Sequence, residues 1–118
     1  MPGTLTITTL SDGTNSTSTT NCIQGSAKAW VNFSGTTAAI AASYNVSSVV
    51  RNSVGNYTVN FTNSFADAKY SAVQTNVNTA AGAVAQVYSQ AAGSCVLLCY
   101  NTVGTFFDTT TVSATFNR

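Results

Sequence analysis

The 118-residue sequence contains no histidine and no glutamate, and its acidic residues are the three aspartates Asp12, Asp67 and Asp108. Histidine and glutamate are common general bases in enzymes, and a serine or cysteine nucleophile needs such a base beside it. Glycoside hydrolysis normally needs two carboxylates that flank the scissile bond. We therefore predict no catalytic residues, and a weak glycan hydrolase built on these aspartates is kept only as a rival hypothesis.

Charge is also scarce: 6% of the residues are charged and the net charge is +1. Nucleic-acid binding needs a basic surface that neutralises several phosphates, and four scattered positive side chains do not form one. No apolar run approaches the roughly 20 residues of a membrane-spanning helix. We expect neither nucleic acid nor a membrane as a partner.

The start of the chain, MPGTLTITTL, lacks the basic segment and the long apolar segment of a signal peptide. This predicts synthesis in the cytosol without export by that route.

The three cysteines are Cys22, Cys95 and Cys99, an odd number that argues against a disulfide framework. On one strand, Cys95 and Cys99 would lie about 13 Å apart, too far for a disulfide. With no histidine and no second cysteine pair, the sequence provides no set of zinc ligands. We predict free thiols that pack as small apolar groups, with no metal site and no cofactor.

Threonine, serine, asparagine, valine and alanine dominate the rest of the chain, a composition that suits pleated strands and the turns between them. Apolar and polar residues alternate in AKAWVNF (27–33) and in YTVNF (57–61), which is typical of strands with one buried face. A hairpin between residues 45–50 and 57–61 would place Val49 beside Val59.

Other segments are expected to be extended or to form loops. Strands are predicted at 4–10, 37–44, 69–76, 83–90, 94–101 and 111–117. Residues 14–21 are either a surface arm or a polar strand, 62–68 form a loop with Phe65 buried, 78–82 form a turn, and a short helix within 79–92 is an alternative. About eight short strands with frequent turns predict one all-β domain over residues 1–118, an antiparallel β-sandwich or jelly-roll.

Trp30 shares one strand face with Lys28 and Asn32, whereas Val31 and Phe33 occupy the other face. A tryptophan on a polar face can bind carbohydrate or contact another subunit. It can also pack against a second sheet, as large aromatic side chains usually do. We take Trp30, Lys28, Asn32 and Tyr57 as the candidate ligand-binding residues.

The motifs of the central segment follow one another in a distinctive order. GSAKAWVNF (25–33) is followed by a short apolar segment and an SYNVSSV run within 39–50, then by GNYTVNFT (55–62) and ADAKY (66–70). With the upstream SDGTNS turn, this order resembles a domain that recurs at the C-termini of tail-fibre proteins of tailed bacteriophages. Family members commonly carry arginine where this chain has Ala41.

The resemblance implies a trimeric β-structured fibre tip or a related appendage, made in the host cytoplasm and located in the virion. Residues 1–24 are expected to form an arm that docks on another phage structural protein of the tail, baseplate or capsid, because Met1 lies close to the domain and no shaft precedes it. Residues 25–70 would form the tail-fibre-like core.

The leading hypothesis is a short tail fibre or receptor-binding tip, a homotrimer that recognises a host-surface glycan without catalysis. The alternative is a capsid decoration or head-fibre protein that stabilises the shell.

Overall fold

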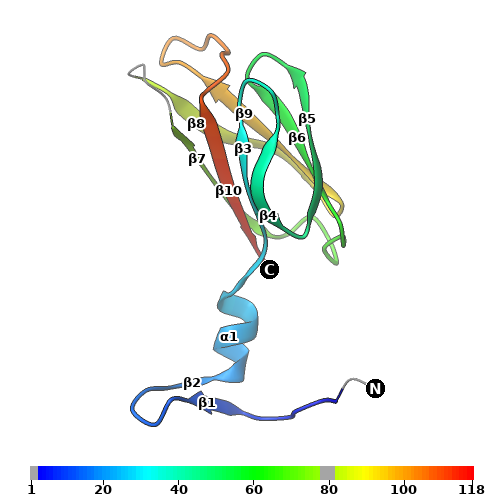
Figure 1. Cartoon of the computed structure of the whole chain (residues 1–118), viewed down its shortest axis with the longest axis vertical. Helices are drawn as coiled ribbons and strands as arrows, with labels where there is room; N and C mark the ends of the chain where they lie inside the picture. The colour runs from blue at the N-terminus through cyan, green and yellow to red at the C-terminus, as the bar shows by residue number, and fades with distance from the viewer. Residues whose placement is uncertain (1–2, 78–81) are drawn as a thin grey trace.

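The computed structural model describes residues 3–77 and 82–118 (Figure 1). A β-sandwich begins at residue 27, and residues 3–26 form an arm that projects from one end of it. The arm contributes to an elongated shape of 50 × 31 × 25 Å.

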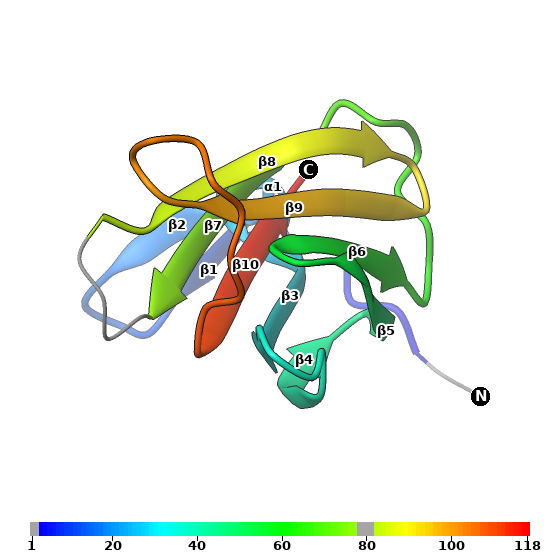
Figure 2. The same ribbon diagram turned by 90° about the horizontal axis from the view of Figure 1, so that it is seen from above.

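Two four-stranded antiparallel sheets form the sandwich, with their faces packed together (Figure 2). The first, which we call the β3 sheet, has the order β4 (Ile40–Tyr44), β3 (Ala27–Ser34), β10 (Thr111–Asn117) and β7 (Ser71–Val77). The second, the β6 sheet, has the order β5 (Val46–Ser53), β6 (Asn56–Phe61), β9 (Ser94–Tyr100) and β8 (Val84–Ala91). The predicted all-β antiparallel sandwich is confirmed, and so is the pairing of Val49 with Val59.

Every second side chain of the central strands points into the core. Strands β3, β6, β9 and β10 supply every buried residue of the core cluster except Tyr70: Ala29, Val31, Phe33, Tyr57, Val59, Phe61, Cys95, Leu97, Cys99, Val112, Ala114 and Phe116. Each fully buried large apolar side chain stabilises the fold by about 1.5–3 kcal/mol. At one end of the core Phe61 contacts Phe65, Tyr70 and Phe116 edge to face, so the predicted burial of Phe65 is confirmed in part, since its side chain is half-buried.

Asn45 alone carries the chain from β4 in one sheet to β5 in the other. Its φ is 55°, a left-handed conformation that asparagine tolerates better than most residues. Its side-chain amide donates to the carbonyl oxygens of Lys28 and Asn63, and its side-chain oxygen accepts from the Asn63 amide at 2.7 Å. These bonds fix the corner between the sheets.

The loop between β9 and β10 packs tightly against the β3–β4 turn of one sheet and the β5–β6 turn of the other. A Cβ at Gly35 would lie 2.1 Å from the carbonyl oxygen of Thr109, and one at Gly55 would lie 2.8 Å from that of Phe107 in the loop and 2.3 Å from that of Cys99 in β9. Gly55 also has a φ of 65°. Glycine at both positions therefore lets the loop seat directly on the backbone.

Asp108 ties this loop to the sandwich. Its Oδ2 accepts from Arg51 at Nε (3.0 Å) and Nη2 (2.7 Å), and its Oδ1 accepts from the Gly55 amide at 3.0 Å. The Tyr57 hydroxyl lies 2.9 Å from the same Oδ1 and 2.6 Å from the carbonyl oxygen of Gly35. The hydrogen bonds from Arg51 are the main reason that the pKa of Asp108 is lowered.

The arm contains a hairpin and a short helix. Its elements are β1 (Thr9–Ser11), β2 (Ser16–Ser18) and α1 (Thr19–Gly25). Ser18 caps α1, because its hydroxyl accepts from the Asn21 amide at 3.2 Å. Of the strand predicted at 4–10, only residues 9 and 10 are in a strand. The segment 14–21, predicted as a surface arm or a polar strand, contains β2 and the start of α1, a helix that was not predicted.

The later strands agree with the prediction to within a few residues. Residues 84–91 are a strand, so the alternative of a helix there is wrong. The predicted turn at 78–82 lies largely outside the described residues. Within the described ranges, no helix has the length and apolar character needed to cross a membrane.

Replacing Asp108 with asparagine should lower the free energy of unfolding by about 2 kcal/mol at pH 7, because a charged acceptor of several hydrogen bonds is lost. The pKa of Asp108 is lower in the folded chain than its ordinary value of 3.8. Its contribution is therefore present above about pH 4 and disappears as the pH falls through the folded pKa. Urea unfolding of both proteins from pH 7 to pH 3 measures this.

The matched control is Asp67→Asn, because Asp67 pairs with Arg118 in an exposed salt bridge of 2.8 Å. Such pairs contribute less than about 1 kcal/mol. Equal losses in the two variants, or a loss in Asp108→Asn that persists unchanged at pH 3, would contradict the assigned role.

The cysteines give a second prediction. All three are free; Cys95 and Cys99 are buried in β9 and Cys22 is partly exposed in α1. Burial raises the pKa of Cys95 to about 11 and also raises that of Cys99. A thiol-specific disulfide reagent at pH 8 should modify Cys22 first and the two core thiols only at the rate of unfolding.

Mass spectrometry of the modified chain counts the reacted thiols. Cys22→Ser should abolish the fast phase, and urea should expose all remaining thiols. A native chain in which Cys95 or Cys99 reacts as fast as Cys22 would show that the core opens far more readily than its packing indicates.

Candidate functional site

The solvent-facing side of the β3 sheet carries the tryptophan. The single Trp of the chain, Trp30, is 39% exposed, and Lys28 and Asn32 lie on the same side of β3 in partly buried positions. The predicted grouping of these three residues on one strand face is confirmed by the burial of Ala29, Val31 and their neighbours on the other. Trp30 packs on the outside of the sandwich and not between the sheets.

Strand register builds a row of side chains across this face. Trp30 pairs with Tyr44 on β4 and with Thr115 on β10, and Thr115 pairs with Val73 on β7. Tyr44 is 60% exposed and Val73 is 57% exposed. Three strand spacings make the row about 14 Å wide. We call these four residues the Trp30 row.

A polar row lies next to it. Asn32 pairs with Ser113 on β10, and the Asn32 amide donates to the Ser113 hydroxyl at 2.7 Å. Ser113 pairs in turn with Thr75 on β7. A shallow hollow of about 100 Å³ lies here, lined by Val73, Thr75, Ser113, Ala114 and Thr115. The face thus combines aromatic side chains with amide and hydroxyl groups beside a small depression.

Lys28 stands at the end of this face near the arm. Its Nζ donates to the carbonyl oxygens of Ile23 and Ser26, the latter at 2.9 Å. Because its ammonium group is held by the backbone of the arm, Lys28 stabilises the junction between arm and sandwich. The Trp30 row and the polar row contain no charged residue.

Tyr57 does not belong to this face, which corrects the prediction that grouped it with Trp30. It lies on β6 in the other sheet, with no exposed surface, and its ring packs edge to face on Phe33 at 5.2 Å. Burial raises the pKa of its hydroxyl, which is held by Gly35 and Asp108. Its alternation with Val59 and Phe61 was the signal for a core position.

Tyr44 and Val73 are two large residues of the face that were not among the candidate ligand-binding residues. Tyr44 ends a segment in which all five residues are exposed, so no alternation indicated which side it would take. Val73 was part of a predicted strand, but its position beside Thr115 depends on the order of β10 and β7 in the sheet.

The three aspartates each have separate partners. Asp12 accepts from the backbone amides of Thr14 and Asn15 within the β1–β2 turn, Asp67 pairs with Arg118, and Asp108 pairs with Arg51. Across residues 3–77 and 82–118, no three His, Cys, Asp or Glu side chains cluster in a way that could hold a metal ion.

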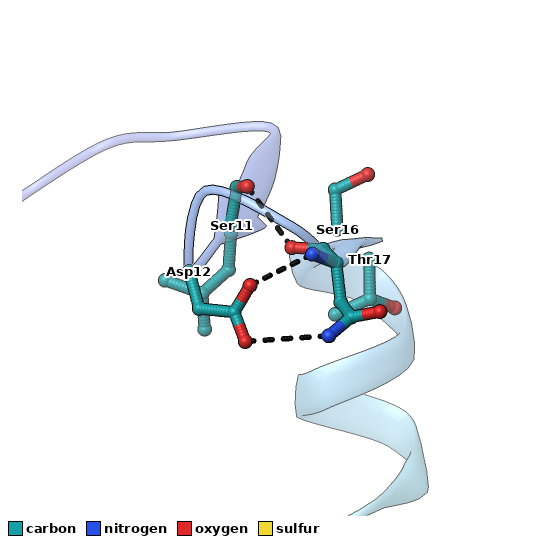
Figure 3. Close-up of a pocket in the computed structure, with 6 residues that line it drawn as sticks. Ser11, Asp12, Ser16 and Thr17 are labelled. Atoms are coloured by element: carbon teal, nitrogen blue, oxygen red, sulfur yellow. Dashed lines mark hydrogen bonds between the residues drawn. The ribbon is translucent and has the colours of Figure 1, made fainter.

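An open hollow of about 440 Å³ lies at the arm hairpin (Figure 3). It is lined by Leu10, Ser11, Asp12, Asn15, Ser16 and Thr17. The polar groups that surround it bond to one another: the Ser11 hydroxyl donates to the Asn15 carbonyl oxygen at 2.9 Å, and Asp12 accepts from Asn15 at 2.7 Å. These bonds close the turn, so its polar groups are engaged in local structure.

Comparisons of the chain with protein-family models, with curated proteins and with solved structures give no match.

Proposed function

We propose that this chain is a non-catalytic structural protein of a bacteriophage virion, a short tail fibre or receptor-binding tip that binds a host-surface glycan. The observation that carries the proposal is the Trp30 row, an exposed row with two aromatic side chains that, like the polar row beside it, contains no charged residue. The runs that resemble tail-fibre domains support it, because AKAWVNF forms β3, the strand that presents Trp30.

The chemistry of the face suits a neutral saccharide. The rings of Trp30 and Tyr44 offer apolar surface for the C–H faces of sugar rings. Tyrosine and tryptophan suit such partly solvated contacts, because each combines an apolar ring with a polar group. Asn32, Ser113 and Thr75 offer amide and hydroxyl groups beside them. Because neither row carries a charge, binding should depend little on ionic strength.

A capsid decoration or head-fibre protein is the second candidate. The edge strand β4 favours it, because all five of its residues are exposed and none is charged. Such an edge can accept a strand from another protein. Immunogold labelling of intact particles separates the two candidates, since a tail tip and a capsid shell are distinct locations.

The glycan proposal predicts that Trp30→Ala and Tyr44→Ala each weaken binding, Trp30→Ala by about tenfold or more, as removal of a central aromatic contact does at other interfaces. Binding can be followed by the fluorescence of Trp30, since it is the single tryptophan of the chain. Probes are O-polysaccharide from lipopolysaccharide and neutral glucans, mannans and galactans. Variants without Trp30 are measured by calorimetry.

The matched control is Tyr88→Ala, because Tyr88 is 67% exposed but lies on β8 in the other sheet. It should bind like the unmodified chain, at both low and high salt. Failure of every probe to change Trp30 fluorescence, or an equal loss in Tyr88→Ala, counts against a glycan site on the β3 sheet.

A further inference from the structure

The arm carries large apolar side chains that stay exposed and do not belong to the hydrophobic core. Leu5 is 81% exposed, Ile7 39%, Leu10 53% and Ile23 64%. No residue from 3 to 26 is buried. An exposed apolar set of this kind marks an interaction surface.

The arm is also too small to be stable without outside contacts. Its two strands have three residues each and its helix has seven. Two-stranded hairpins and helices shorter than about 12 residues are marginal in water. Among residues 3–77 and 82–118, the side-chain bonds that join the arm to the sandwich lie only at its end, from Lys28 to Ile23 and Ser26 and from Asn117 to Gly25 at 3.3 Å.

Residues 4–7 run extended ahead of a bend at Thr8, and the segment 4–8, TLTIT, has a strand sequence but no strand partner within the described part of the chain (Figure 1). Among the described residues, none makes a hydrogen bond with residues 4–6, and the bonds to Ile7 and Thr8 come from Thr19 alone. Unpaired backbone in an extended segment is a template for pairing with another chain.

The solvent-accessible surface of the chain indicates how much area a partner could bury. A folded chain of 12.2 kDa is expected to expose about 6,000 Å², whereas this chain exposes 7032 Å². The excess of about 1,000 Å² is close to the roughly 800 Å² that one partner contributes to a standard protein interface. The radius of gyration, 16.9 Å, also exceeds the value of about 13.5 Å for a domain of this length.

We propose that residues 4–8 of two copies of this chain pair as antiparallel strands about a two-fold axis at Thr6. In that register Leu5 of one copy lies opposite Ile7 of the other, and both pairs fall on the same face. The segment is self-complementary and uncharged, so two copies meet without like charges. Asp12, the one acidic residue of the arm, is engaged in its own turn.

The pairing leaves the β3 sheet free, because the arm projects from the end of the sandwich (Figure 1). The proposed pairing of the arms does not rest on the proposed glycan binding.

The expected mass in solution is twice 12.2 kDa at tens of micromolar chain, measured by sedimentation or by light scattering. The double variant Leu5→Ser/Ile7→Ser should raise the dissociation constant by at least a hundredfold, because four large apolar side chains leave the interface. The control is Val103→Ser, a residue 83% exposed at a loop tip, which should leave the mass unchanged. Circular dichroism verifies that each variant keeps the sandwich.

Charge at the axis tests the register. Thr6→Lys and Thr6→Glu each place two like charges opposite one another and should weaken pairing about fivefold. A mixture of the two variants should pair more tightly than either alone. The control is Thr14→Lys in the β1–β2 turn.

A mass of one chain would overturn self-association. A mass of three chains would overturn the two-fold register and would agree with the trimer that the tail-fibre resemblance implies. A two-chain species that survives Leu5→Ser/Ile7→Ser would place the interface outside the arm.

Discussion

Burial of one face of each sheet against the other is the constraint on which the rest of this molecule depends. Because side chains alternate along a strand, the same constraint that places Val31 and Phe33 in the core directs Trp30 and Asn32 to solvent. The same alternation of side chains therefore determines both the core and the candidate binding face. A shift of β3 by one residue would bury Trp30 and expose the core, so the position of the face is as secure as the core itself.

The strands with clear alternation were predictable from sequence. Residues 27–33, 57–61 and 111–117 became β3, β6 and β10 with little change at the ends. The helix α1 was not predictable, because its residues have modest helix propensity and Ser18 lacks the glutamate three positions later that marks a capping box. Residues 4–8 have a strand sequence but find no strand partner among the residues that the structure describes. Local pattern predicts conformation better than it predicts pairing.

The candidate site was predictable only in part for the same reason. Lys28, Trp30 and Asn32 come from one strand, so alternation alone groups them. Tyr44 and Val73 join them through the register of β4 and the order of β10 and β7, which a single sequence does not contain. Tyr57 was assigned to the site by residue type, although its own alternation favours the core. Within one strand, periodicity is a better guide to exposure than residue chemistry.

Because the β9–β10 loop packs closely on some turns of the sandwich, the turns differ in whether they can accept a larger residue or an insertion. Gly35 and Gly55 lie against loop backbone, where even one added carbon collides. Gly104, at the outer end of that loop, has no atom within 4 Å of a Cβ. Beside it Val103 is 83% exposed. A foreign peptide grafted between residues 103 and 104 would be displayed away from the core, while the same insertion at residue 35 would displace the β9–β10 loop at Thr109.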